Sequence, residues 1–161
     1  MADLEYWSDN RRFGLKIAEE KLSQLLKMCI RAGTNETGGI LVGFYTELES
    51  CAVITAVSGV PSDSRSGSNW FNRGTSGLQG WLNHLWNQNK QYYLGEWHFH
   101  PYESPHPSQT DIKQMKRIAF SVLYQCPEPL LLIVGGSPTD KWDVKAYVFP
   151  RNQSFIELLK K

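Results

Sequence analysis

The segment from Gly95 to Asp111 constrains the fold most, because a strand-like run ends there in a turn and a helix begins directly afterwards. Alternate residues of an extended strand lie on the same face, with a rise of about 3.3 Å per residue. His98 and His100 therefore stand side by side, roughly 6.6 Å apart along the backbone. Residues 101–107 contain three prolines, which cannot continue a strand ladder and which stiffen the turn. The sequence predicts two histidines at a strand end, followed by a rigid turn and a helix.

His98, His100 and Asp111 have the residue types of a metal site. Ser108 is expected to start the helix, so that Asp111 lies one turn in. Two imidazoles and one carboxylate form a ligand set that catalytic zinc uses, with the fourth position left for water. Taken alone, the two histidines would be interpreted as exposed or hydrogen-bonded strand residues, but Asp111 at this offset favours a metal site. Ser-x-x-Asp at a helix start also resembles a capping box, although Glu or Gln is usual at the last position, and capping therefore stays an alternative for Ser108.

At full spacing, His98-x-His100, seven residues, Ser108, two residues and Asp111 resemble the JAMM signature of the JAB/MPN metalloproteases. That signature also has a glutamate far upstream, beside a glycine-rich strand start, and Glu36 stands at such a place. Without the signature, Glu36 would be interpreted as a solvated loop residue. The resemblance implies that one Zn²⁺ ion is held by the two histidines and Asp111. It implies two catalytic residues, Glu36 as general base for zinc-bound water and Ser108 as a hydrogen-bond partner of that water or of the oxyanion.

Three further side chains near the motif have open interpretations. Glu96 shares the strand face of the two histidines, but as a fourth ligand it would close the open coordination position, so a salt bridge or an outer contact is favoured. His106 lies in the proline-rich turn, where exposure is favoured over substrate contact. Phe99 replaces the small Ser or Thr that is usual between the two histidines of this family. It points to the opposite face of the strand, so we expect it to change packing and not ligation.

The resemblance extends over about residues 13–149 and implies a JAB/MPN-like α/β (α+β) fold, a mixed β-sheet flanked by helices in a single domain, 1–161. Hydrophobic periodicity predicts a matching order of elements. The predicted strands are 13–18, 39–46, 51–61, 92–100, 130–136 and 142–149, and the predicted helices are 19–32, 75–89, 108–124 and 154–161. Strands 39–46 and 51–61 are expected to form a hairpin. The fully apolar run 130–136 is typical of a buried central strand.

The helices are expected to bury apolar stripes. In the second helix the predicted inward residues are Leu78, Leu82, Leu85 and Trp86, and in the third they are Ile112, Met115, Ile118, Ala119 and Val122. Residues 62–69, rich in Ser, Asp and Gly, predict a mobile surface loop. Trp70 and Phe71 follow it as an apolar island that belongs either to the core or to a contact surface. This loop, the island and the 101–107 turn are candidate contact regions for a protein substrate.

The resemblance also implies an activity. It is that of a zinc metalloprotease (isopeptidase) that hydrolyses the bond between the C-terminus of a ubiquitin-like or conjugated protein and its target lysine or the following residue. A compact single-domain chain resembles the prokaryotic branch of the family. Residues 93–101 resemble members from bacterial CBASS antiphage systems, which reverse conjugation of a signalling nucleotidyltransferase. The alternatives are a peptidase that trims a sulfur-carrier protein to its Gly-Gly terminus and a non-catalytic MPN scaffold, although a scaffold would normally have lost one of the motif residues.

Composition narrows the classes of partner. Of the 161 residues, 41% are hydrophobic and 20% are charged, the net charge is +1, and basic residues cluster only in short pairs, so binding of nucleic acid is not expected. No apolar run approaches the roughly 20 residues of a membrane span. The first residues have neither a basic nor an apolar leader region, and the three widely spaced cysteines are interpreted as reduced thiols. We therefore expect a cytoplasmic protein that binds no membrane.

Overall fold

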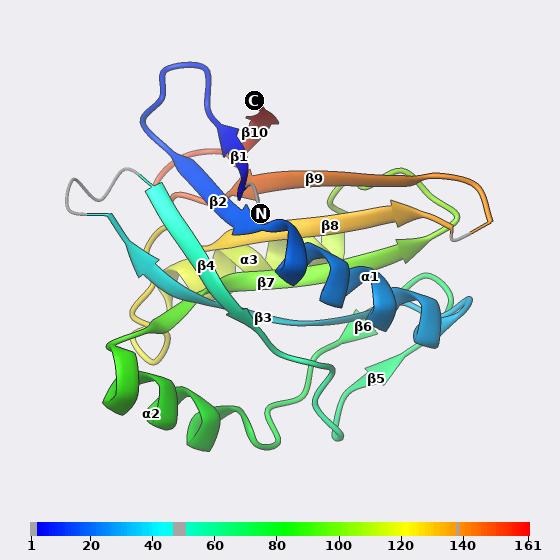
Figure 1. The fold of residues 1–161 in the computed structure, drawn as a ribbon, viewed down its shortest axis with the longest axis horizontal. Helices are drawn as coiled ribbons and strands as arrows, with labels where there is room; N and C mark the ends of the chain where they lie inside the picture. The colour runs from blue at the N-terminus through cyan, green and yellow to red at the C-terminus, as the bar shows by residue number, and fades with distance from the viewer. Residues whose placement is uncertain (1–2, 47–50, 138) are drawn as a thin grey trace.

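Eight strands close into a barrel in the computed structural model, which describes residues 3–46, 51–137 and 139–161 (Figure 1). The barrel strands are β1 (Asp3–Trp7), β2 (Gly14–Ala18), β3 (Thr37–Tyr45), β4 (Cys51–Val57), β7 (Tyr92–Pro101), β8 (Leu130–Gly136), β9 (Trp142–Val148) and β10 (Ile156–Lys160). Their order around the barrel is β1-β10-β9-β8-β7-β3-β4-β2. β2 pairs with β4, and β7 with β8, in parallel, whereas the other neighbours are antiparallel. The sheet is therefore mixed, as predicted.

Helices cover the barrel, and a short ribbon lies beside it. The helices are α1 (Glu19–Ala32), α2 (Leu78–Asn89) and α3 (Gln109–Phe120), and the ribbon consists of β5 (Arg65–Ser66) and β6 (Phe71–Asn72). In Figure 1, α1 crosses in front of the strands, α3 lies behind them, and α2 lies below, near the start of β7. The predicted fold class, a mixed sheet flanked by helices, is confirmed. Within the described residues, no helix is long and apolar enough to cross a membrane.

The strand β8 separates two apolar clusters, since its alternate side chains point to opposite faces. Leu130, Leu132 and Val134 pack in the cluster that also receives α1, and Leu131 and Ile133 pack in the cluster beneath α3. All five side chains are buried. The prediction of a buried central strand is therefore confirmed, as is that of the hairpin, because β3 and β4 pair in antiparallel fashion.

The two ends of the chain were not predicted correctly. Residues 154–161 were predicted to form a helix, but β10 forms there and pairs with both β9 and β1. A helix this short is marginal in water, whereas the alternating Ile156 and Leu158 place apolar side chains on one face of a strand. β1 had no counterpart among the predicted elements. Together β1 and β10 close the barrel, so that neither exposes a free sheet edge.

Elements around the outer helices differ from prediction in their bounds. Helix α3 ends at Phe120 and not at residue 124, and Val122, which was assigned to its apolar stripe, is 83% exposed. Helix α2 begins at Leu78, and Trp86 is exposed although its inward burial was predicted. Part of the predicted 62–69 loop forms β5, which pairs with β6. The apolar island divides, because Phe71 is buried and Trp70 is exposed.

Candidate metal centre

Both histidines of the motif lie on β7 and are buried there, with 1% of His98 and 4% of His100 exposed. β7 runs between β3 and β8, and Gly38 of β3 is the residue opposite His98. A Cβ atom at Gly38 would lie only 2.9 Å from Cδ2 of His98 and 2.8 Å from the ring of Phe71. Gly38 thus lets the imidazole of His98 and the Phe71 ring come close to the β3 backbone.

The turn that follows β7 is fixed to the end of β8. Tyr102 N donates a hydrogen bond to Gly136 O (2.9 Å), and Gly136 N donates one to Glu103 O (3.0 Å). The hydroxyl of Tyr147 donates to the carbonyl oxygen of Pro105 (2.7 Å). These bonds set the position from which α3 starts.

Helix α3 begins with a capping box formed by Ser108 and Asp111. Ser108 Oγ accepts a hydrogen bond from Asp111 N (3.0 Å), and Asp111 Oδ2 accepts one from Ser108 N (2.9 Å). The capping interpretation is therefore correct, but it does not exclude a metal site. The carboxylate of Asp111 also faces both histidines, because Oδ1 lies 3.0 Å from His98 Nδ1 and Oδ2 lies 3.2 Å from His100 Nε2.

The three side chains together fit a cation. One donor atom from each of His98, His100 and Asp111 lies within 4.8 Å of the other two, and all three residues are buried. Among the described residues, His100 Nε2 is a buried nitrogen without a hydrogen-bond partner of suitable geometry, despite its approach to Asp111. Buried polar atoms are nearly always paired. An imidazole nitrogen in this situation, beside a carboxylate oxygen, can bind a metal ion through its lone pair.

Glu36 lies beside these three residues, at the start of β3. It is buried, its Oε1 lies 3.8 Å from His100 Nε2, and its backbone N–H donates to Gly67 O (2.9 Å). Burial raises the pKa of the Glu36 carboxyl, and the nearby Asp111 charge adds to the rise, while His100 and His98 lower it in part. A carboxylate whose pKa is moved toward neutrality is suited to accept and return a proton.

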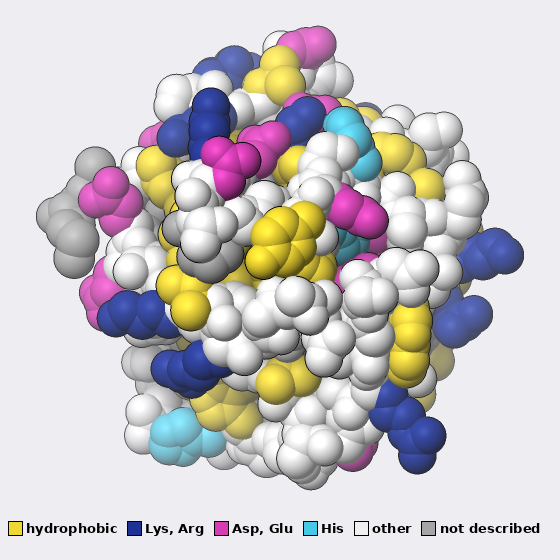
Figure 2. Space-filling model, turned by 90° about the vertical axis from the view of Figure 1, so that its right-hand side faces the viewer, with side chains coloured by type: hydrophobic (Ala, Val, Ile, Leu, Met, Phe, Trp, Pro, Cys, Tyr) yellow, Lys and Arg dark blue, Asp and Glu magenta, His cyan; other side chains and the backbone are white. Residues whose placement is uncertain are grey.

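Burial and neighbouring charges act in opposite directions on the pKa values of Asp111 and His100. Burial alone would raise the pKa of Asp111, but its contacts with His100 and His98 hold that pKa well below its usual value. Burial likewise disfavours charge on His100, yet the carboxylates of Asp111 and Glu36 outweigh it and raise the His100 pKa. Figure 2 views the end of the molecule toward which β7 and β8 run, and a histidine is visible there, recessed among acidic side chains.

The predicted site residues therefore come together, apart from one. Glu36, His98, His100 and Asp111 are adjacent, whereas Ser108 joins them through Asp111 as the helix cap. His106 is exposed, as favoured.

Two interactions near the site carry no local sequence signal, because they join residues far apart in the chain. They are the salt bridge between Arg73 and Glu96 (2.5 Å) and the contact of the Phe71 ring edge with His98 (5.5 Å between centroids). The favoured interpretation of Glu96, a salt bridge, is correct.

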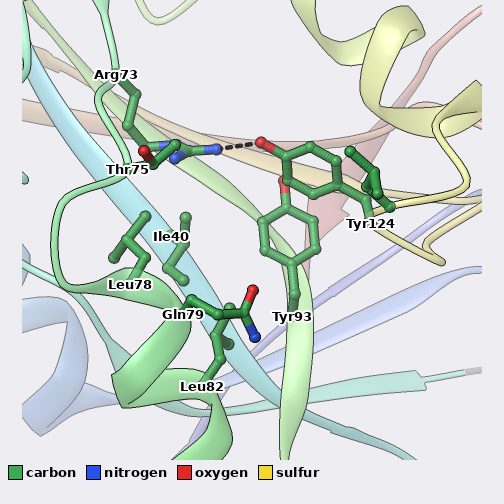
Figure 3. A pocket seen from close by; sticks show the side chains of 9 residues that line it. Ile40, Arg73, Thr75, Leu78, Gln79, Leu82, Tyr93 and Tyr124 are labelled. Atoms are coloured by element: carbon green, nitrogen blue, oxygen red, sulfur yellow. Dashed lines mark hydrogen bonds between the residues drawn. The ribbon is translucent and has the colours of Figure 1, made fainter.

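A separate cavity of about 490 Å³ lies between α2 and the segment that follows α3 (Figure 3). Its lining residues are Ile40, Arg73, Thr75, Leu78, Gln79, Leu82, Tyr93, Leu123 and Tyr124. None of the three candidate metal ligands lines it. The cavity meets the surroundings of the metal centre through Arg73 and Tyr93, which both donate hydrogen bonds to Glu96 on β7.

The fold and the site define a class of protein: a barrel domain in which two strand histidines and a helix-start aspartate could hold a metal ion beside a buried glutamate. The family described as prokaryotic homologs of the JAB domain matches residues 18–147. The chain belongs to this family.

Similar proteins support this family assignment. The chain is 40% identical over 156 residues to a CD-NTase/cGAS isopeptidase of Enterobacter hormaechei, covering 97% of this chain and 86% of that protein. It is 27% identical over 135 residues to a probable metalloprotease of Sinorhizobium fredii, covering 82% and 81%. A solution structure of a Desulfitobacterium hafniense protein has the same fold, with a TM-score of 0.61, 21% identity and coverage of 88% and 87%. The chain is thus a hydrolytic enzyme, a metallopeptidase of the JAB type.

Proposed function

We propose that this enzyme is an isopeptidase that uses one Zn²⁺ ion held by His98, His100 and Asp111. The proposal depends above all on the grouping of three donor atoms, from three buried residues, within 4.8 Å of one another. In the part of the chain that the structure describes, the His100 Nε2 atom of this group has no hydrogen-bond partner of suitable geometry. When bound, zinc supplies a Lewis acid that polarises the scissile carbonyl and lowers the pKa of water toward 7.

Glu36 is the general base of the proposed mechanism. It accepts the proton of the attacking water and passes it to the leaving amine. Its burial supports this role, because burial raises the pKa of the carboxyl and so strengthens it as a base. Its Oε1 lies 3.8 Å from His100 Nε2, so the carboxylate is next to the candidate ligands, although Glu36 is not one of them.

Ser108 is proposed to stabilise the oxyanion of the tetrahedral intermediate. Its Oγ accepts the capping hydrogen bond from Asp111 N, which occupies a lone pair of the hydroxyl. A serine hydroxyl has one proton to donate and two lone pairs, so the capping bond leaves the proton available. Ser108 is also exposed, which allows a substrate to reach it. Capping and oxyanion binding are therefore compatible at this residue.

The proposed substrate is a protein joined through its C-terminus to a lysine. Support comes from the Enterobacter hormaechei relative, which is named as an isopeptidase of CD-NTase/cGAS and aligns with 97% of this chain. We infer that this enzyme, in the cytoplasm, releases a conjugated nucleotidyltransferase or a ubiquitin-like protein. It would thereby reverse a bacterial ubiquitin-like conjugation in antiphage defence, with no nucleic acid or membrane as partner.

Cleavage of a defined conjugate tests the proposal. The purified enzyme is incubated with a CD-NTase whose C-terminus is linked to a lysine of a reporter protein, and its zinc content is measured in parallel. We expect one bound zinc ion, release of the reporter, and loss of release after chelation. A Gly-Gly-terminated sulfur carrier with extra C-terminal residues serves as the competing substrate. If the enzyme trimmed only that carrier, the sulfur carrier and not the conjugate would be its substrate. If the protein bound no zinc and were inactive, it would be a non-catalytic scaffold.

A further inference from the structure

The segment at β6 lies along β7 at the metal centre and touches it at two points. Phe71 presents its ring edge to the imidazole of His98, with ring planes at 76°. Two residues further on, Arg73 pairs with Glu96, which lies two residues before His98. Residues two apart in an extended segment share a face. Phe71 and Arg73 therefore form adjacent contacts from one segment onto one face of β7.

The Arg73–Glu96 pair is buried and its geometry is fixed by several hydrogen bonds. Only 9% of the Arg73 side chain and 4% of the Glu96 side chain are exposed. Arg73 Nε and Nη2 each donate to one oxygen of the carboxylate, at 2.5 and 3.1 Å. Tyr93 OH donates to Glu96 Oε2 (2.5 Å). Two-point pairing of guanidinium and carboxylate sets orientation as well as distance.

The pair also reaches a third part of the chain. Arg73 Nη2 donates to Tyr124 OH at 2.6 Å, a bond that is drawn in Figure 3. Tyr124 follows α3, and its ring contacts that of Tyr93 at 4.8 Å between centroids. One guanidinium thus joins β6, β7 and the segment after α3.

The turn of the ribbon, next to Phe71, touches Glu36. Gly67, next to β5, accepts a hydrogen bond from Glu36 N and donates one to Trp70 O (3.0 Å). The β5–β6 ribbon therefore contacts two residues of the proposed mechanism, Glu36 through its backbone and His98 through Phe71. Gly67 and Phe71 are not candidate ligands themselves. They contact the proposed base, Glu36, and one candidate ligand, His98, and can therefore fix the positions of both.

We propose that Arg73 and Phe71 are positioning residues of the metal centre. The Arg73–Glu96 pair fixes the β6 segment against β7, and Phe71, held there, fixes the ring orientation of His98. This rests on the proposed function, because the centre is the same. A buried ion pair adds little to stability compared with apolar residues of similar size. Orientation of a ligand by its neighbours, in contrast, commonly changes metal affinity by about 10–100-fold.

The test compares Arg73→Met with Arg65→Met, which removes an exposed arginine of the same ribbon. Zinc affinity is measured by chelator competition, the Co²⁺-substituted protein is examined by absorption spectroscopy, and unfolding of the metal-free protein is followed separately. For Arg73→Met we expect zinc affinity to fall by about tenfold or more and the Co²⁺ bands to shift. Arg73→Lys should not restore them, because a lysine cannot pair with both carboxylate oxygens. Arg65→Met should match the wild type.

A second variant applies if Arg73→Met does not fold. Phe71→Leu keeps an apolar side chain against Gly38 but removes the ring edge from His98. We expect weaker zinc binding and altered Co²⁺ bands, with folding of the metal-free protein retained. The inference is overturned if the folded variants bind zinc as tightly as the wild type, with unchanged Co²⁺ spectra, whatever their melting temperatures. Failure of the wild type itself to bind zinc would instead refute the proposed function.

Discussion

The two sides of the candidate metal centre are held by different kinds of contact. On one side, the 101–107 turn is bound to the end of β8 mainly through its backbone. Two N–H···O bonds join it to Gly136, and the Tyr147 hydroxyl bonds to the Pro105 carbonyl. The capping box of Ser108 and Asp111 then continues the same run of local bonds into α3.

On the other side, the β5–β6 ribbon is attached mostly through side chains. One backbone bond joins it to Glu36, whereas side chains supply the contact of the Phe71 ring with His98, the buried Arg73–Glu96 pair and the Arg73–Tyr124 bond. Backbone bonds depend little on residue identity, whereas a buried ion pair that loses one partner leaves an unpaired charge. The turn should therefore tolerate single substitutions better than the ribbon does. Four predictions test this contrast, in order of decreasing effect.

Asp111→Asn should have the largest effect, because both sides of the centre meet at this carboxylate. Asparagine keeps the shape and a carbonyl oxygen for the cap, but it loses the charge that faces His98 and His100. We expect zinc affinity to fall by more than about 100-fold, beyond what an outer residue costs. Chelator competition measures the affinity, and Asp9→Asn, at an exposed position, is the control. Tight zinc binding by Asp111→Asn would remove this residue from the ligand set.

Glu36→Gln separates chemistry from binding. The amide cannot accept the proton of water, so we expect the rate of cleavage to fall by about 10²–10⁴-fold. Zinc affinity should stay that of the wild type, because Glu36 is not among the candidate ligands. Steady-state cleavage and chelator competition on the same preparation give both values. A variant that loses zinc together with activity would show that Glu36 serves as a ligand.

These two sides also differ in how far they could be predicted from sequence. His98, His100 and Asp111 lie within one strand–turn–helix segment, and strand alternation with a proline-rich turn is enough to bring them together. Glu36 is distant in sequence and was assigned only through a family resemblance. The structure then placed it beside the three others.

The ribbon side could not be predicted, because its contacts depend on how a loop packs. A salt bridge was expected for Glu96, but several arginines could have supplied it, and Arg73 lies 23 residues away. Phe71 belongs to an apolar island for which core and contact surface were both open. The prediction of a C-terminal helix was wrong for a related reason. Pairing with β1 and β9 decides between strand and helix there, and a pattern over a few residues cannot show that pairing.

Tyr147→Phe tests the turn side directly. Removing the hydroxyl leaves the buried Pro105 carbonyl without its partner, which should cost about 1–2 kcal/mol of unfolding free energy. The backbone bonds to Gly136 remain, so zinc affinity should be nearly that of the wild type. Denaturant unfolding and chelator competition measure the two effects, with Tyr102→Phe at an exposed hydroxyl as the control. A loss of affinity as large as that of Arg73→Met would abolish the contrast between the two sides.

The smallest expected effect is a pH dependence of the metal-free protein. His100 faces the carboxylates of Asp111 and Glu36, with Glu103 further out, and its pKa is raised in the folded state. A raised folded-state pKa contributes stability that is present below the unfolded value of about 6.5 and is lost as the pH rises through the folded value. The pKa of Glu36 is also raised, so its contribution to stability is likewise lost as the pH rises, beginning at a lower pH than for His100. Metal-free protein should therefore become less stable from pH 6 upward.

Zinc should reverse this trend, since a ligand imidazole must be neutral and protons compete with the ion. Thermal unfolding across the pH range, with and without zinc, measures both slopes. His100→Gln should flatten the metal-free slope above pH 6, whereas His106→Gln, at an exposed histidine in the turn, should leave it unchanged. If His106→Gln flattened the slope instead, the titrating group would belong to the turn and not to the centre between the turn and the ribbon.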